Sequence, residues 1–186
     1  MDRAKPLLCT YAVDYGPVEV VDFTNGDTDW DIQIHAYGTT EIWAHSAFFD
    51  RMVLTKLLGV ETPIEKWRCS QALALSHSLP GGLDPLCEVL KVPTEQAKIK
   101  DGKRLIQKFC CRKEFKKDEE WPLFIQYAKN DVIAMRECIA RMPNWNYKNS
   151  ELDLWHLDQR INNRGFAVDR LLADRTCGTT RPLPLR

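Results

Sequence analysis

Short apolar runs separated by turn-forming residues open the chain, and this pattern predicts strands. Residues 7–13 form a short apolar segment that contains Thr and Tyr, and residues 18–23 are rich in β-branched side chains. The segment between them reads Asp-Tyr-Gly-Pro, which favours a turn. The two apolar segments are therefore expected to form an antiparallel hairpin. A short helix over residues 31–37 and an apolar strand over residues 41–45 are expected to follow.

Helical spacing dominates the rest of the chain. In residues 47–58, Phe49, Met52, Val53 and Leu57 fall on one stripe, and Ser46 precedes them as a residue type that favours N-caps. Further helices are expected over residues 70–76, 83–90, 102–110, 119–142 and 151–163. Pro143 is expected to end the longest of these helices, Ser150 to cap the last, and Gly165 to close it.

Composition narrows the classes of protein that fit. The chain has 186 residues, 44% hydrophobic and 28% charged, which suits one soluble domain with a real core. The formal net charge is +0, so any binding to nucleic acid must come from a local patch or from metal ions. The seven cysteines contain no C-x-x-C pair, and no apolar window approaches the roughly 18 residues of a spanning helix. A reducing cytoplasm without membrane attachment is the expected setting.

Two carboxylates stand out as candidates for chemistry. Asp50 lies one turn inside the helix that follows E-I-W-A-H. Asp131 lies four residues after Tyr127 on the longest helix, so the phenol and the carboxylate can share one face. Spacing alone also allows a solvated helix face for each acid and a core position for the tyrosine. His45 has two readings as well, a metal ligand or a packed histidine at the end of a strand.

The sequence segments around these residues resemble the proofreading 3′-5′ exonuclease domain of phage- or prophage-type family A DNA polymerases. A-H-S-A-F-F-D-R-M-V-L, ending at Leu54, resembles the second exonuclease motif, and Y-A-K-N-D, from Tyr127 to Asp131, resembles the Tyr-type third motif. W-R-C-S-Q-A-L-A-L, L-P-G-G-L-D-P-L and D-G-K-R-L-I-Q-K-F-C are similar to segments that such domains carry between the two motifs. L-D-Q-R-I-N-N-R-G-F-A-V-D resembles the passage into the polymerase domain.

The resemblance implies an α/β fold of the RNase H-like exonuclease type, a mixed sheet flanked by helices. It implies metal-assisted removal of nucleotides from single-stranded DNA 3′ ends, with Mg²⁺ or Mn²⁺ in a two-metal site. Asp50 and Asp131 would be the metal ligands, and Tyr127 would orient the attacking water. The residues implied in DNA binding are Ser46, Phe49, Arg51, Lys108 and Arg112. The last two belong to a basic stretch over residues 98–117, which is either a rim for phosphates or a solvated face.

The sequence departs from the family at its first motif. That motif is D-x-E on the opening strand, and no D-x-E precedes the strand at residues 7–13. The opening strand is central in RNase H-like sheets, so its neighbours are expected to lose their hydrogen-bond partners. Asp22 could be a degenerate first motif, with Thr24 in place of the glutamate. Ser46 stands where the family usually has Asn.

The expected organisation follows from the resemblance. Residues 7–142 would form the exonuclease-like domain, residues 150–174 a linker helix and the start of a polymerase region, and residues 175–186 an unstructured tail. The domain is expected to be cut short at both ends, with impaired exonuclease activity and no polymerase activity, because no polymerase motif is present. A partner polymerase domain would be absent from this chain. The alternative is a noncatalytic nucleic-acid-binding remnant of the same fold.

Overall fold

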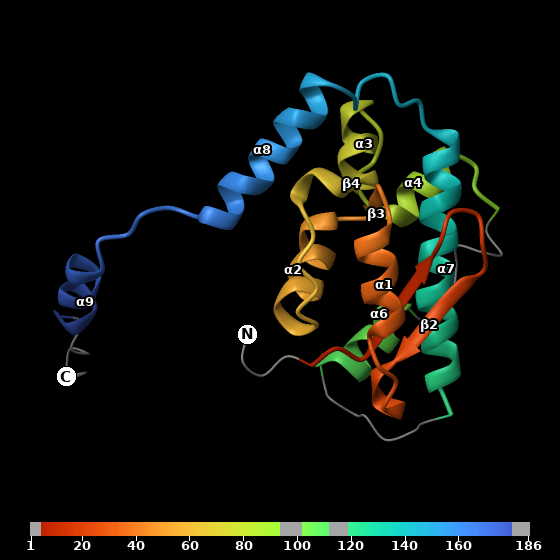
Figure 1. Cartoon of the computed structure of the whole chain (residues 1–186), viewed down its shortest axis with the longest axis horizontal. Coiled ribbons are helices and arrows are strands. Elements are labelled where there is room, and N and C mark those ends of the chain that lie inside the picture. Colours follow the sequence, from red (N-terminus) through yellow and green to blue (C-terminus); the bar gives the residue numbers. More distant parts are fainter. Residues whose placement is uncertain (1–4, 94–101, 112–118, 180–186) are drawn as a thin grey trace, which may run out of the picture.

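The computed structural model describes residues 5–93, 102–111 and 119–179 and shows a mixed α/β chain (Figure 1). The first half contains β1 (Leu8–Ala12), β2 (Val18–Asp22), the 3-10 turn η1 (Phe23–Asn25), α1 (Trp30–Gly38), β3 (Ile42–Ala44), α2 (Ala47–Leu57), η2 (Ile64–Lys66) and β4 (Trp67–Cys69). The second half is helical, with α3 (Ser70–Ser76), α4 (Leu83–Val89), α6 (Gly102–Ile106), the π-helical turn η3 (Gln107–Cys111), α7 (Trp121–Arg141), α8 (Ser150–Arg164) and α9 (Arg170–Thr179).

The strands form two separate pairs in the described part of the chain. β1 and β2 are antiparallel, with Leu8 opposite Asp22, which confirms the expected hairpin. β3 and β4 are parallel, with Ile42 opposite Trp67. One mixed sheet was expected, and each pair here is a two-stranded sheet of its own.

Helices cover both faces of the hairpin because side chains alternate along a strand. On one face, the Thr10 hydroxyl donates to the Ala128 carbonyl of α7 at 3.2 Å. Arg136, also on α7, donates to the Gly16 carbonyl in the hairpin turn at 2.8 Å. On the other face, the Tyr11 ring lies 5.6 Å from the His35 ring of α1. The longest helix is thereby fixed against β1 and β2.

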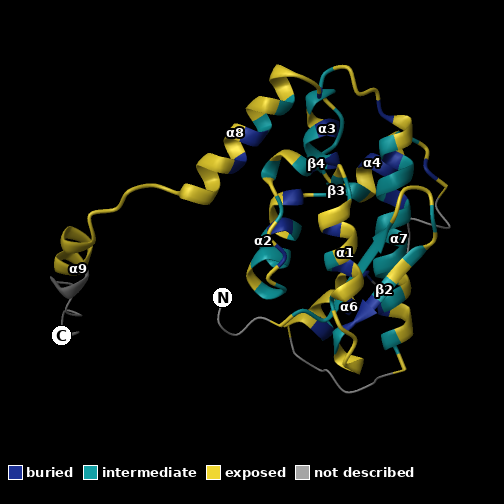
Figure 2. Ribbon diagram, viewed as in Figure 1, coloured by how far each residue is buried: buried dark blue, intermediate teal, exposed yellow. Residues whose placement is uncertain are grey.

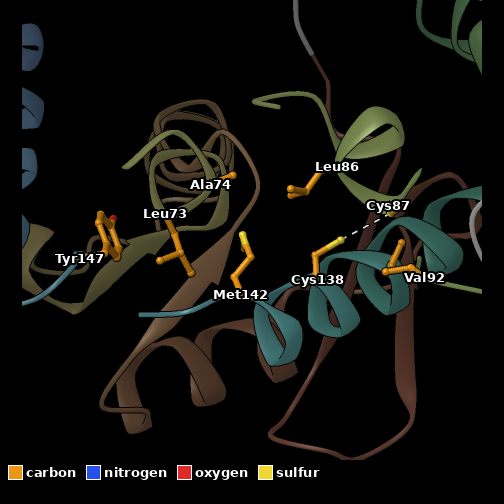
Figure 3. Close-up of a cluster of buried hydrophobic side chains, with 9 residues drawn as sticks. Leu73, Ala74, Leu86, Cys87, Val92, Cys138, Met142 and Tyr147 are labelled. Carbon is orange, nitrogen blue, oxygen red and sulfur yellow. Dashed lines mark hydrogen bonds between the residues drawn. The ribbon is translucent and has the colours of Figure 1, made fainter. Parts of the chain in front are cut away.

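The largest buried cluster joins α3, α4 and α7 (Figure 3). Its buried members are Leu73, Ala74, Leu86, Cys87, Val92, Ala134, Cys138, Met142 and Tyr147. Cys87 of α4 and Cys138 of α7 bring their Sγ atoms within 3.5 Å of each other (Figure 3). The Tyr147 hydroxyl accepts from the Cys69 backbone N–H at 3.1 Å, which ties the cluster to β4. The cluster therefore sets where α4 lies relative to α7.

Two expectations about the ends of elements are corrected. The N-cap of α8 is Asn149 rather than Ser150, and no side-chain capping bond is made there, while Gly165 closes the helix at φ 69° as expected. Residues 170–179 form α9, so the segment expected to be unstructured from residue 175 begins inside a helix. α9 stands apart from the body, and α8 and α9 are largely exposed (Figures 1 and 2). None of the described helices is long and apolar enough to cross a membrane.

Candidate active site

Tyr127 and Asp131 face each other on α7, as their spacing predicts. The Tyr127 hydroxyl donates a hydrogen bond to the Asp131 carboxylate, and both side chains are half-buried. Burial raises the pKa of Asp131 to about 6, the nearby Asp84 raises it as well, and the bond from Tyr127 partly opposes the rise. Burial, and then the charge of Asp131, raises the pKa of Tyr127 to about 12. The pair is a desolvated carboxylate beside a phenol that stays protonated at neutral pH.

Asp84 is a neighbour that the sequence did not single out. It lies in the first turn of α4, is exposed, and interacts electrostatically with both Tyr127 and Asp131. The packing of Leu86 and Cys87 on α7 carries Asp84 to this position. The segment L-P-G-G-L-D-P-L contains Asp84, so its likeness to the family was the one signal in the sequence that could have drawn attention to this acid.

Asp50 has surroundings of its own on α2. Burial raises the pKa of this carboxyl to about 6, and its own backbone N–H partly opposes the rise. Burial also raises the pKa of the Cys9 thiol on β1 to about 11, with a smaller effect from the charge of Asp50. Asp50 therefore lies near β1, and its role as a metal ligand together with Asp131 stays a prediction.

The donor chemistry suits a hard divalent cation, but the described residues do not supply a full set of donors. Carboxylate oxygens are suitable ligands for Mg²⁺ or Mn²⁺, and burial raises the pKa of both Asp50 and Asp131. Within residues 5–93, 102–111 and 119–179, however, no group of three or more His, Cys, Asp or Glu side chains is arranged to hold a metal ion. The described residues therefore do not by themselves make a two-ion site.

His45 is a packed histidine that joins the motif segments. Its Nδ1 lies 3.0 Å from the Ser70 hydroxyl and its Nε2 lies 3.0 Å from the Gly81 carbonyl. Gln71 also donates to the Gly81 carbonyl, at 2.9 Å. Burial lowers the pKa of His45, which favours the neutral ring with Nε2–H donating to Gly81 and Nδ1 accepting from Ser70. The hydrogen bonds of His45 thus join the end of β3 to the start of α3 and to the turn before Asp84.

Ser46 occupies the N-cap position of α2, but its hydroxyl makes no capping bond. The expected cap fails because Ser46 is left-handed, at φ 62° and ψ 47°, whereas a capping residue is normally extended. Asn tolerates this conformation better than Ser. The conformation therefore gives a physical reason for Asn at the corresponding place in the family.

A Ser46→Asn substitution is expected to raise the free energy of unfolding by about 0.5 kcal/mol, because it relieves part of the left-handed strain. Ser46→Ala, which keeps the strain and removes a hydroxyl without a capping role, is expected to change it little. Urea unfolding of both variants measures the difference. A loss of stability in Ser46→Asn would contradict this explanation.

The remaining DNA-binding candidates differ in their exposure to solvent and in their partners. Phe49 is 59% exposed, while Arg51 is 8% exposed and donates to Asn163 of α8 at 2.9 Å. Lys108 forms an ion pair of 2.5 Å with Glu120, which also holds Arg104. Arg112 lies outside the described residues. Contact with DNA stays a prediction for all of these residues, and Phe49 is the most open to solvent of those described.

Asp22 is engaged elsewhere and does not approach Asp131. It is 4% exposed, and its Oδ2 accepts from the Trp121 indole at 2.8 Å and from the Asn25 amide at 2.9 Å. Its Oδ1 caps η1 by accepting from the Thr24 N–H at 2.9 Å. Trp121 begins α7, and Asp131 lies ten residues further along, about 15 Å of helix. Asp22 therefore secures the hairpin to the start of α7, and the geometry does not favour it as a degenerate first motif.

Comparison with known proteins gives one strong similarity. The chain is 32% identical over 178 residues to a DNA polymerase of Bacillus phage SP02, and the alignment covers 88% of this chain and 27% of the polymerase. The chain thus spans about a quarter of the length of the curated relative it matches. No family model matches the sequence. No solved structure matches it either. The similarity supports a polymerase-related domain.

Proposed function

We propose that the chain is a 3′-5′ exonuclease domain fragment of a family A DNA polymerase that hydrolyses phosphodiesters at DNA 3′ ends. The observation that carries the proposal is the Tyr127–Asp131 pair, a desolvated carboxylate bonded to a phenol, in a chain similar to a phage DNA polymerase. Raised pKa values of this kind concentrate at functional sites. The proposed substrate is a single-stranded DNA 3′ end, met in the cytoplasm during proofreading.

The side chains present have defined roles in this proposal. Tyr127 keeps its proton at neutral pH, and with its hydroxyl held by Asp131 it can orient a water molecule beside the scissile phosphate. Asp50 and Asp131 would be ligands of Mg²⁺ or Mn²⁺. Such ions, when bound, supply a more acidic water and stabilise the leaving oxygen. Because the described residues do not complete a two-ion site, the activity of this chain is proposed to be weak.

The alternative is a noncatalytic nucleic-acid-binding remnant of the same fold. It is favoured because no group of three or more metal-ligating side chains occurs among the described residues, and a binding protein needs no convergence of carboxylates. Phe49, with 59% of its surface exposed on α2, offers a ring on which a base could stack.

Digestion of a 3′-end-labelled single-stranded oligonucleotide tests the proposal. With Mg²⁺ or Mn²⁺ the chain is expected to shorten the oligonucleotide stepwise, and Asp131→Asn is expected to abolish the shortening without unfolding the protein. Asp174→Asn, a change of the same kind on the exposed α9, is the matched control and should digest as the unchanged chain does.

Binding without digestion distinguishes the alternative. Filter retention of the same oligonucleotide in excess chelator should be strong for a noncatalytic binder and unchanged in Asp131→Asn. If the folded chain neither digests nor retains the oligonucleotide, both proposals are wrong.

A further inference from the structure

The geometry points to Gly102 as a positioning residue for Tyr127, an inference that rests on the proposed role of that tyrosine. A Cβ placed on Gly102 would stand 2.8 Å from both Cδ2 and Cζ of the Tyr127 ring and closer still to Cε2. Ordinary Cβ contacts are longer than 3.0 Å. The ring of Tyr127 therefore lies directly on the backbone of Gly102, in space that every other residue type would fill.

The requirement for glycine here is space and not backbone conformation. The glycines with positive φ among the described residues are Gly26, Gly59 and Gly165, so Gly102 is not one of them. Gly102 begins α6 and is buried. An alanine could adopt the same backbone, and the three atoms nearest to its Cβ all belong to the tyrosine ring.

Packing prevents α6, which carries Gly102, from moving away from α7. Leu105 and Phe109, one and two turns further on, are each 0% exposed and pack with Phe124 of α7. The centroids of the Phe109 and Phe124 rings are 5.2 Å apart, and the Phe109 and Trp121 rings are nearly perpendicular with centroids 5.0 Å apart. This aromatic cluster fixes the separation of α6 and α7, so a methyl group at position 102 must be accommodated by movement of the Tyr127 ring.

Movement of the Tyr127 ring would displace its hydroxyl. Tyr127 reaches Asp131 from within one helix, so a displaced ring loses the bond that aligns the phenol with the carboxylate. Gly102 thus acts on the site through Tyr127 and needs no contact with a substrate. This predicts that its replacement damages the geometry of the pair more than the overall fold.

Urea unfolding of Gly102→Ala is the first measurement. Overpacking a buried contact of this kind is expected to lower the equilibrium constant for folding between about fivefold and 150-fold. Gly38→Ala is the matched control, because a Cβ at Gly38 meets nothing within 4 Å and its φ is not positive. It is expected to leave the constant unchanged or to raise it slightly.

Removing the ring should remove the effect. In a Tyr127→Ala background, Gly102→Ala is expected to cost less than about twofold, because the atoms that the methyl group meets are gone. In a Tyr127→Phe background the full cost should persist. If Gly102→Ala does not fold, recovery of folding in Gly102→Ala/Tyr127→Ala supports the inference. Failure of the double variant while Tyr127→Ala folds would overturn it.

A positioning role has a signature that a structural role lacks. The energetic coupling between Tyr127→Phe and Asp131→Ala, measured by a double-mutant cycle, should be present in the unchanged chain and absent when Gly102 is Ala. Retained coupling would overturn the inference. If the chain digests DNA, Gly102→Ala should lower kcat and leave KM nearly unchanged. If the chain does not digest DNA, the proposed function is wrong, but the coupling measurement still tests whether Gly102 positions Tyr127.

Discussion

Replacing Trp67 with alanine is expected to lower the free energy of unfolding by about 3–5 kcal/mol, the range for truncating a buried large aromatic side chain. Trp67 is 1% exposed and lies at the start of β4, opposite Ile42. Its ring packs with Ala47 of α2 and Cys69 of β4, and Leu54 and Trp155 lie against the same cluster. The β3–β4 pair, α2 and α8 therefore meet around this one side chain.

Two features should place the loss in the upper part of that range. The Trp67 indole donates to the Thr62 hydroxyl at 2.9 Å, so truncation also removes a hydrogen bond. β3 and β4 each have only three residues, so few ladder bonds are available to hold the pair once the ring is gone. The Trp67 carbonyl, which lies 3.0 Å from His156 Nε2, is kept in the variant and should not contribute to the loss.

Trp30→Ala provides the matched control, because Trp30 is 68% exposed at the start of α1. Its effect is expected to stay within about 0.5 kcal/mol, as for exposed positions in general. Denaturant unfolding followed by far-ultraviolet circular dichroism measures both variants. Equal effects of the two substitutions would show that the cluster around Trp67 does not support the fold.

Patterns confined to neighbouring residues predicted most of the local structure. The alternation and turn chemistry of residues 7–23 predicted the hairpin, and the apolar stripe of α7 predicted a helix whose observed bounds differ by at most two residues. The i, i+4 spacing of Tyr127 and Asp131 also suffices to bring them together, because one helix fixes both positions. For these features no knowledge of the tertiary fold was needed.

Features that depend on distant packing were missed. β4 was not expected as a strand, because three residues are too few to show alternation, and only the parallel pairing with β3 identifies it. Asp84 lies near Asp131 because α4 packs on α7. Gly102 contacts Tyr127 because α6 also packs on α7. Each contact joins segments that lie 25 or more positions apart, and nothing in local periodicity predicts them.

The failure of the cap at Ser46 has a related cause. A serine before an amphipathic segment predicts a capped helix only if the backbone is extended at that residue. The turn from β3 into α2 is tight, and it places Ser46 at φ 62°. His45 and Ala47 on either side are held by Ser70 and Gly81 and by the Trp67 cluster, so tertiary contacts set the backbone of the turn.

The carboxylate of Asp131 is expected to destabilise the folded chain at neutral pH, so Asp131→Asn should raise the free energy of unfolding by about 1–3 kcal/mol. The folded pKa is raised to about 6 from 3.8. The stability associated with this group is therefore full below pH 3.8 and is lost as the pH rises through 6. Asparagine carries no charge, and its amide oxygen can still accept from the Tyr127 hydroxyl.

Asp50→Asn should behave in the same way, because burial raises the pKa of this carboxyl to about 6 as well. His45 works in the opposite direction: its lowered pKa gives stability that is present above its ordinary value of 6.5 and is lost as the pH falls through the folded value.

Urea unfolding over a series of pH values from about 4 to 8 separates these contributions. The gain in Asp131→Asn should be largest above pH 6 and should vanish toward pH 3.8. A carboxylate kept at a cost to stability is what a binding or catalytic site requires, because a solely structural position would favour the amide. A loss of stability in Asp131→Asn at neutral pH would instead make this side chain a structural acceptor and remove the main support for an exonuclease site on α7.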